Sequence, residues 1–407
     1  MEGNSLKIKK FLQKEIWVLF FLTFAFHFFV SFFLNFFNFY PYQIPDANFY
    51  HTAALELSKR WKNGVFSWND IYISNWYPYF LAFFYTIIFP SKITGVFITV
   101  ILAGLSVLFL YRLMKEMGAE EKIAIFSSFL FSSLYLSYNY FGNVLLKDTL
   151  LIPLILFILL MALSIIKKFS FLNTFFFILF FLFLYQLRWP YALLLNFFFI
   201  FFPFFTNRSF SQKFFYFLFF FFLFFFLPFL SKGGFCGIRF IKPHNPEKIV
   251  YLRQVGYSIG NSSLNLSFEN KNQLSKNNHS FFLSWFYFFF SKDNFQNFLI
   301  YLYNFLTVLI GPFPWQLKIR YLPVLFEAIP WWFCFAVILF GLFKNLKKKE
   351  TLFIFFLALG FCFLISLLSD NLGANLRYRM PAFFLLFSIF PLGLKEILKK
   401  FKKLPEV

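Results

Sequence analysis

The sequence predicts an all-α polytopic membrane protein, and three of its features carry that prediction. The 407 residues are 60% hydrophobic and 27% aromatic but only 14% charged, which leaves too few polar side chains to cover a soluble domain. Apolar runs of membrane-spanning length, roughly 17 to 25 residues, recur from Ile16 to the C-terminal region. The runs are apolar on every face and lack the alternation of a membrane β-barrel. We therefore expect a bundle of about 10 to 12 transmembrane helices with loops on the outer face.

The net charge of +21 comes from Lys and Arg residues that stand in short runs next to the apolar segments. This arrangement favours contacts with anionic membrane lipids and predicts no nucleic-acid partner. The chain has three cysteines, and its four histidines are far apart without the spacing of metal ligands. We expect neither a bound metal nor a cofactor.

The basic joints between apolar runs predict how the chain is oriented. If these joints lie in the cytoplasm, the chain crosses the membrane ten times and both termini are cytoplasmic. We expect the protein to lie in the inner (cytoplasmic) membrane of the cell. The joints on the inner side are 7–14, 111–122, 167–168, 206–213, 344–350 and the tail from 395 onward. Those on the outer side are 39–92, FGNVLLKD, YQLRWP, the region from 231 to about 330, and SDNLGANLRYRM.

This topology divides the chain into three parts. Residues 1–230 form an N-terminal transmembrane module that includes the outer loop 39–92, and residues 298–407 form a C-terminal transmembrane module. Between them, residues 231–297 are rich in Asn, Ser and Lys and form an outer soluble loop. Two apolar stretches, 77–90 and 298–315, must then stay on the outer side as interfacial or re-entrant segments. Both contain or end in proline, and the first is shorter than a bilayer crossing, which favours the interfacial interpretation. If either is a true span, the number of spans rises.

The outer loop 39–92 opens with an acidic residue, Asp46, in front of a predicted surface helix. In that helix an apolar face is formed by Tyr50, Ala53, Ala54, Leu57 and Trp61. Asp46 has two interpretations: a helix N-cap, which is a common role for Asp, or a functional carboxylate. The sequence around it does not separate the two.

Several cations stand at the outer ends of the predicted spans, where the orientation rule disfavours them. They are Lys147, Arg188, Arg377 and Arg379, and Asp148 follows Lys147 directly. An apolar setting such as that of Arg188 requires an anionic partner. Together the cations suit a phosphate or pyrophosphate, which Arg binds through two hydrogen bonds. The alternatives are that Lys147 and Asp148 reach to the interface, and that Arg377 and Arg379 anchor the last span at lipid headgroups.

Three segments of the chain resemble the GT-C glycosyltransferases, in particular bacterial enzymes related to the protein O-mannosyltransferases and to the aminoarabinose transferase of lipid A. The first loop contains PDANFYHTAALELSKRW, the next apolar stretch is NWYPYFLAFFYTIIFP, and the C-terminal region contains LRYRMPAFFLLFSIFPLGL. The resemblance covers most of residues 10–200 and 320–400. It implies a GT-C-like bundle and transfer of a sugar from a polyprenyl-phosphate donor to a glycan, lipid or protein acceptor on the outer, periplasmic face.

The resemblance also implies roles for individual residues. Asp46 corresponds to the acid that acts as catalytic base toward the acceptor in this family, and Arg377 and Arg379 match its late arginine motif, which we expect to bind the donor phosphate. From the predicted topology we add Arg188 and Lys147 as further phosphate ligands, with Asp148 and His51 in support. Many relatives carry paired acids in the first loop, but here Ala47 follows Asp46, so no metal is expected.

Two other classes of function fit parts of the same pattern. A polymerase or ligase of O-antigen or another polysaccharide also needs outward arginines beside a helical bundle, although the early acidic loop favours the transferase. A transporter of lipid-linked sugars needs charged residues near the middle of its spans. Here the spans are almost uncharged away from their ends.

Overall fold

The structure is a computed structural model that describes residues 2–37, 45–66, 75–231, 295–317, 324–369 and 372–401. Every element in these ranges is a helix, and eight helices are long and apolar enough to cross a membrane. They are α1 (Glu2–Phe36), α4 (Lys92–Glu116), α7 (Lys147–Lys167), α8 (Phe171–Phe201) with η1 (Phe202–Phe205), α9 (Phe210–Leu230), α14 (Leu325–Lys344), α15 (Lys349–Leu368), and α17 (Met380–Phe387) with α18 (Phe390–Phe401). The chain is a multi-pass, all-α membrane protein, as the sequence predicted.

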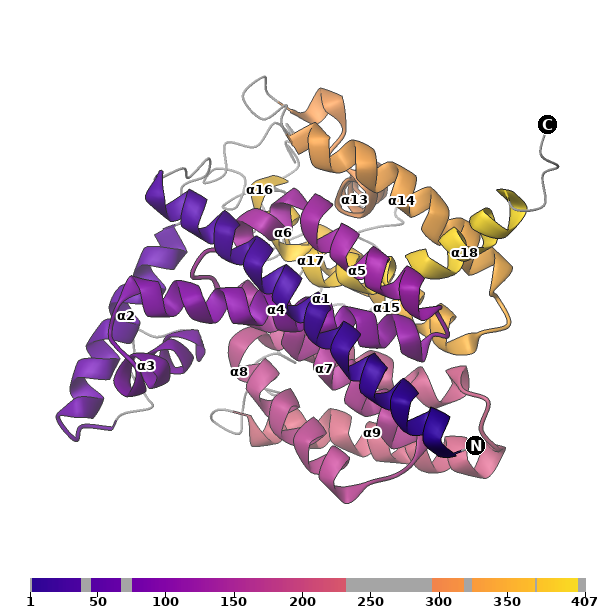
Figure 1. Ribbon diagram of the computed structural model, residues 1–407, viewed down its shortest axis with the longest axis horizontal. Helices are drawn as coiled ribbons and strands as arrows, with labels where there is room; N and C mark the ends of the chain where they lie inside the picture. Colours follow the sequence, from indigo (N-terminus) through magenta and orange to yellow (C-terminus); the bar gives the residue numbers. More distant parts are fainter. Residues whose placement is uncertain are drawn as a thin grey trace, which may run out of the picture.

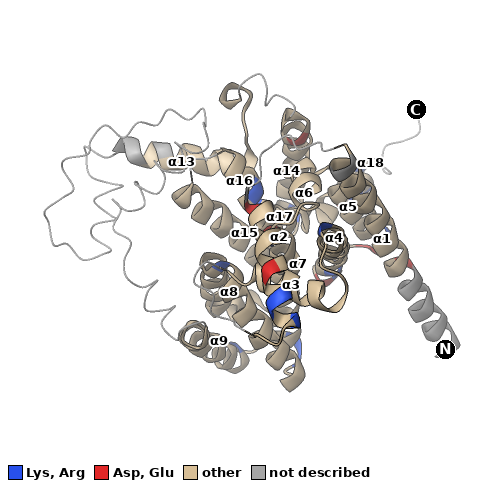
Figure 2. Cartoon of the chain, turned by 90° about the vertical axis from the view of Figure 1, so that its left-hand side faces the viewer, with Lys and Arg blue, Asp and Glu red and all other residues tan. Residues whose placement is uncertain are grey.

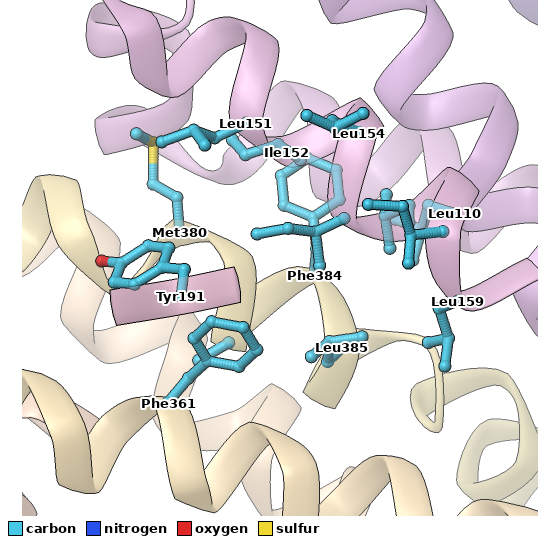
Figure 3. Packing of buried hydrophobic residues seen from close by; sticks show 14 of the residues in the cluster. Leu110, Leu151, Ile152, Leu154, Leu159, Tyr191, Phe361, Met380, Phe384 and Leu385 are labelled. Atoms are coloured by element: carbon cyan, nitrogen blue, oxygen red, sulfur yellow. The ribbon is translucent and has the colours of Figure 1, made fainter. Parts of the chain in front are cut away.

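The centre of the bundle is built around α7 (Figure 1). This helix packs between α4 and α8 and also touches α17, which lies against α15. Figure 3 shows the contact: Leu151 and Ile152 of α7 approach Met380 and Phe384 of α17, with Phe361 of α15 below. All five side chains are buried. Close packing of such side chains supplies van der Waals attraction, which drives helix association within a membrane.

Helix α8 reverses its direction at Arg188, where the backbone leaves the helical region (φ −157°, ψ 83°). The rings of Phe177 and Phe181, before the reversal, lie 5.7 and 6.0 Å from the ring of Phe199, after it. A straight helix would separate these residues by about 30 Å. Pro190 favours the break, because a proline inside a helix has no N–H to bond to the carbonyl four residues before it. The predicted turn YQLRWP is therefore confirmed.

The described residues contain eight long apolar helices. One of them, α8 with η1, forms two antiparallel legs of the bundle, because the chain reverses at Arg188. Another apolar stretch is divided between two helices: α5 (Glu121–Leu134) has only 14 residues, and the short helix α6 (Leu136–Phe141) follows it after Tyr135.

Three shorter helices stand outside the set of long ones. They are α2 (Pro45–Lys62), α3 (Tyr77–Ile87) and α13 (Phe295–Ile310). The 11 residues of α3 and 16 of α13 span only about 16 and 24 Å, less than a bilayer core. Both stretches were predicted not to cross. In Figure 1, α2 and α3 lie together at the left of the bundle. Tyr50, Leu57 and Trp61 of the predicted apolar face of α2 are buried.

The end of the bundle opposite to α2 gathers the basic joints. Lys167 pairs with Glu116, Lys395 pairs with Glu120 at 2.7 Å, and Lys348 donates to the carbonyl of Met117. These contacts connect the ends of α4, α7 and α18 with the start of α15. The joints that the sequence assigned to one side therefore do share one end of the molecule. The predicted loop 231–297 falls outside the described residues except at its edges.

Candidate functional site

Four elements that are far apart in the sequence meet at the end of the bundle near α2. Asp46 lies in the first turn of α2, Asp148 in the first turn of α7, Arg188 at the reversal of α8, and Arg377 in the last turn of α16 (Leu372–Tyr378). Figure 2 shows basic and acidic segments side by side next to α16. Together with Lys147, these residues form the charged cluster.

Four residues of the cluster form a continuous chain of ion pairs. Nη1 of Arg377 lies 2.8 Å from Oδ2 of Asp46, and Nε of Arg377 lies 2.5 Å from Oδ2 of Asp148. The other oxygen of Asp148, Oδ1, accepts from Nη1 of Arg188 at 2.8 Å. Asp148 therefore holds two guanidinium groups, while Asp46 contacts one. Because α2 begins at Pro45, Asp46 lies inside the first turn and not at the N-cap, and its carboxylate pairs with Arg377 on another helix.

The guanidinium of Arg188 is fixed between two tyrosine rings. Its central carbon lies 4.4 Å from the ring centre of Tyr191 and 3.9 Å from that of Tyr378. The hydroxyl of Tyr191 donates to the carbonyl of Tyr378 at 2.8 Å, which ties α8 to α16. Cation–π contacts of this kind stabilise a partly desolvated arginine. Arg188 thus has the anionic partner that its apolar setting required.

Lys147 is the cation of the cluster that has no ion-pair partner among the described residues. Its side chain is partly buried at the first residue of α7, where the charges of Arg188, Asp148, Arg377 and Asp46 all act on it. Three cations and two carboxylates leave the cluster with a formal balance of +1. An additional anion would therefore be attracted to this place.

The two groups outside the spans that flank Asp46 have shifted pKa values. Burial lowers the pKa of Arg377, but the carboxylates of Asp148 and Asp46 outweigh it and hold that pKa above its usual range. Burial, reinforced by the charge of Asp46, raises the pKa of Tyr50 to about 12. The phenol of Tyr50 accepts a hydrogen bond from Asn75 at 3.4 Å. Arg377 remains a cation and Tyr50 remains neutral near pH 7.

His51 lies away from the ion pairs. Its Nδ1 is 2.8 Å from the hydroxyl of Tyr85 on α3. Burial, together with the charge of Lys92, lowers the pKa of His51 below 6.5, so the ring is neutral near pH 7. Among the described residues, the hydrogen bond and the ring contact of His51 are both with Tyr85, so they join α2 to α3 and not to the cluster. A supporting role of His51 in the site stays a prediction.

Arg379 is not brought to the cluster, although it is only two residues from Arg377. Its side chain is buried between α17 and α14, where Nη2 lies 2.8 Å from Oε1 of Glu327 and Nη1 donates to the carbonyl of Gly311 at 2.5 Å. The second oxygen of Glu327 accepts the backbone N–H of Ser137 at 2.5 Å. Arg379 thus connects α17, α14 and the end of α13, and donor binding by Arg379 stays a prediction.

Next to this buried pair, a pocket opens between α5 and α14. Its wall is formed mainly by apolar side chains, including Leu134, Trp331 and Phe387, with the carboxylate of Glu327 and the ring of Tyr135 at its polar side. Its volume of about 20 Å³ is close to what a single water molecule requires.

Comparison with models of known protein families and with curated proteins finds no match.

Sequence reasoning predicted the charged residues of the cluster but missed Tyr191 and Tyr378, the two tyrosines that hold Arg188. It also missed Glu327, the partner of Arg379 outside the cluster. A signal for Glu327 was present, because an acid within an apolar run, here LFEAIPWWF, requires a buried cationic partner. The two tyrosines had no comparable signal, since they are two among 21 tyrosines and 80 phenylalanines.

Proposed function

We propose that this protein is a membrane glycosyltransferase that moves a sugar from a polyprenyl-phosphate donor to an acceptor on the outer face of the membrane. The observation that supports it is the charged cluster, in which one half-exposed carboxylate, Asp46, stands among three cations at the end of an apolar bundle. The resemblance of three segments of the sequence to the GT-C glycosyltransferases also supports the proposal. No soluble cofactor is required.

The cluster supplies two chemical functions that such a transfer needs. The acceptor is a hydroxyl or amine, and its heteroatom forms a bond to the anomeric carbon while its proton passes to the carboxylate of Asp46. The bond between that carbon and the phosphate oxygen breaks, and its electron pair stays on the phosphate. Negative charge therefore grows on the phosphate, where Arg377 and Lys147 stabilise it more strongly in the transition state than in the ground state.

Asp148 and Arg188 have positioning roles in this scheme. Asp148 is buried and bonded to both arginines, so it fixes the guanidinium of Arg377 at the mouth of the bundle. Arg188 in turn is fixed by its two tyrosines. A preorganised cation does not need to reorient as charge develops, which is the main source of electrostatic catalysis.

The proposed orientation has both termini in the cytoplasm and the charged cluster outside, in the inner membrane of the cell. It is supported by the location of the basic joints, which gather at the end of the bundle opposite to the cluster. Positive residues are retained on the cytoplasmic side during insertion. The donor lipid would then reach the cluster from the outer leaflet.

The test compares transfer with donor binding in purified, detergent-solubilised protein, using lipid-linked sugars extracted from membranes of a deletion strain. Asp46→Asn keeps the size of the side chain but removes its basicity, so transfer should fall about 100-fold or more while donor binding persists. Arg377→Ala should weaken both. The matched control is Glu56→Gln, which removes one exposed carboxylate from the same helix α2.

Near-normal transfer by Asp46→Asn would exclude the proposed base. Mass spectrometry of cell-surface glycans in the deletion strain separates the alternatives. Loss of one sugar substituent supports the transferase, whereas shortened or unattached polysaccharide indicates a polymerase or ligase. Accumulation of a lipid-linked sugar on the inner face alone indicates a transporter.

A further inference from the structure

The two carboxylates bound to Arg377 differ in how firmly they hold it. The side chain of Asp148 is only 4% exposed and contacts both Nε of Arg377 and Nη1 of Arg188, whereas that of Asp46 is 49% exposed and contacts a single nitrogen of Arg377. Pairs buried like that of Asp148 are strongly destabilising to break, whereas exposed pairs contribute little. Arg377 therefore has one permanent partner and one that is easily replaced.

The position of the replaceable partner is the place where an anion would bind. Nη1 of Arg377, which contacts Asp46, points toward the half-exposed side of the cluster, while Nε is turned to the buried Asp148. Lys147 is close enough for its charge to act together with those of Asp46 and Arg377, and it has no ion-pair partner among the described residues. A phosphate that binds Lys147 and Arg377 must compete with the carboxylate of Asp46.

We propose that the donor phosphate displaces Asp46 from Arg377, so that the carboxylate becomes free to accept a proton only when the donor is bound. This inference rests on the proposed function. Asp148 keeps Arg377 in place during the exchange, and α2 carries Asp46 away from the guanidinium. The carboxylate is thereby turned from Arg377 toward the acceptor. Without donor, the ion pair keeps Asp46 occupied and the anion site covered.

The exchange predicts an effect that a simple catalytic or structural role does not. If Asp46 competes with the phosphate, removing its charge should strengthen anion binding. The probe is farnesyl phosphate, an isoprenyl monophosphate, titrated calorimetrically into the purified full-length protein in detergent. We expect Asp46→Asn to bind it about 5- to 10-fold more tightly than the wild type, which is the range of a modest coupling between two sites. Asp46→Ala should change binding in the same direction.

The control is again Glu56→Gln, which makes the same change in net charge on the exposed side of α2. It should leave the affinity for farnesyl phosphate within about twofold, since its charge is screened by solvent. A similar gain in Glu56→Gln would show a general effect of net charge and would overturn the exchange. Unchanged or weaker binding in both Asp46 variants would overturn it as well.

Arg377→Ala and Lys147→Ala distinguish failure of the exchange from failure of the proposed function. If both lose affinity for the probe while the Asp46 variants bind as the wild type does, the phosphate site stands and the exchange is wrong. If both bind farnesyl phosphate normally, the phosphate site itself is wrong, and with it the proposed function. Unfolding temperatures of all variants, measured in the same detergent, identify any loss of binding that comes from misfolding.

Discussion

The two ends of the helical bundle carry similar numbers of ion pairs but use them in opposite ways. At the end with the basic joints, the pair of Lys167 and Glu116 is exposed, with 57% and 40% of the two side chains accessible. At the end with the charged cluster, Asp148 is buried with two arginines, and the pair of Arg379 and Glu327 is buried too. The first end presents charge to solvent and headgroups, whereas the second encloses it.

Enclosed charge in a membrane protein is costly and is retained where it has a role. The exposed pairs are explained by solubility and by orientation in the membrane, and they require no further function. In the enclosed pairs, removing one partner leaves the other as a buried charge without compensation. Substitutions at the two ends should therefore differ in their effects on stability.

The largest expected effect is an all-or-none difference in sidedness. In a protein whose own cysteines are replaced by serine, Asn48→Cys on α2 and Lys347→Cys between α14 and α15 place one exposed thiol at each end. A maleimide that cannot cross the inner membrane is added to cells whose outer envelope lets it through and whose inner membrane is intact. It should label Asn48→Cys and not Lys347→Cys, because basic joints stay in the cytoplasm. The reverse pattern would place the charged cluster inside and remove the basis for an outer-face reaction.

A second comparison sets Asp148→Ala against Glu116→Ala. The first leaves Arg188 and Arg377 buried without their shared carboxylate, and it should destabilise the fold by about 3–5 kcal/mol. The second breaks an exposed pair and should cost less than about 1 kcal/mol. Unfolding in detergent, followed by tryptophan fluorescence, measures both. Equal losses in the free energy of unfolding would mean that the ion pairs at the two ends contribute equally to stability.

The pair of Arg379 and Glu327 tests whether all enclosed charge at this end belongs to the site. Arg379→Met alone should destabilise by about 3–5 kcal/mol. The double variant with Glu327→Leu should recover only part of the loss, because it leaves the backbone N–H of Ser137 and the carbonyl of Gly311 without these partners. If the pair is structural, the stable double variant binds farnesyl phosphate like the wild type. Loss of binding in a well-folded double variant would return Arg379 to the phosphate site.

The smallest effect is a pH dependence that involves His51. Because its pKa is lowered by burial and by Lys92, the unfolded chain takes up the proton first as pH falls. Its contribution to stability is therefore complete above pH 6.5 and is lost as pH falls toward the lower pKa of the folded state. His51→Gln should reduce the change in unfolding temperature between neutral and mildly acidic pH. An unchanged profile would show that His51 is protonated equally in both states.

The sequence alone predicted much of the site because its members are conspicuous in apolar surroundings. Arg188 and Arg377 contradict the orientation rule, and Asp46 opens a loop with a strongly patterned helix. Each of these residues was therefore identified from its own local sequence. Their mutual contacts were not predictable in the same way, since a partner such as Asp148 is 229 positions from Arg377 in the sequence. Only the packing of α2, α7, α8 and α16 brings these residues within bonding distance.

Hydropathy and charge distribution by themselves determined that this protein is a multi-pass helical membrane protein whose basic joints share one end. Both properties depend on the hydropathy and charge of short segments, so they can be predicted without knowing how the helices pack. Tertiary structure decided where the helix that begins at Glu121 ends, since α5 stops at Leu134 and the short helix α6 follows. It also decided the fate of two arginines in the same motif. Arg377, in the last turn of α16, faces Asp46 and Asp148, whereas Arg379 faces Glu327. The backbone at Arg379 is helical (φ −74°, ψ −11°), so side chains two positions apart point about 200° away from each other. Which partners lie in each direction depends on the neighbouring helices, which the sequence of the motif does not contain.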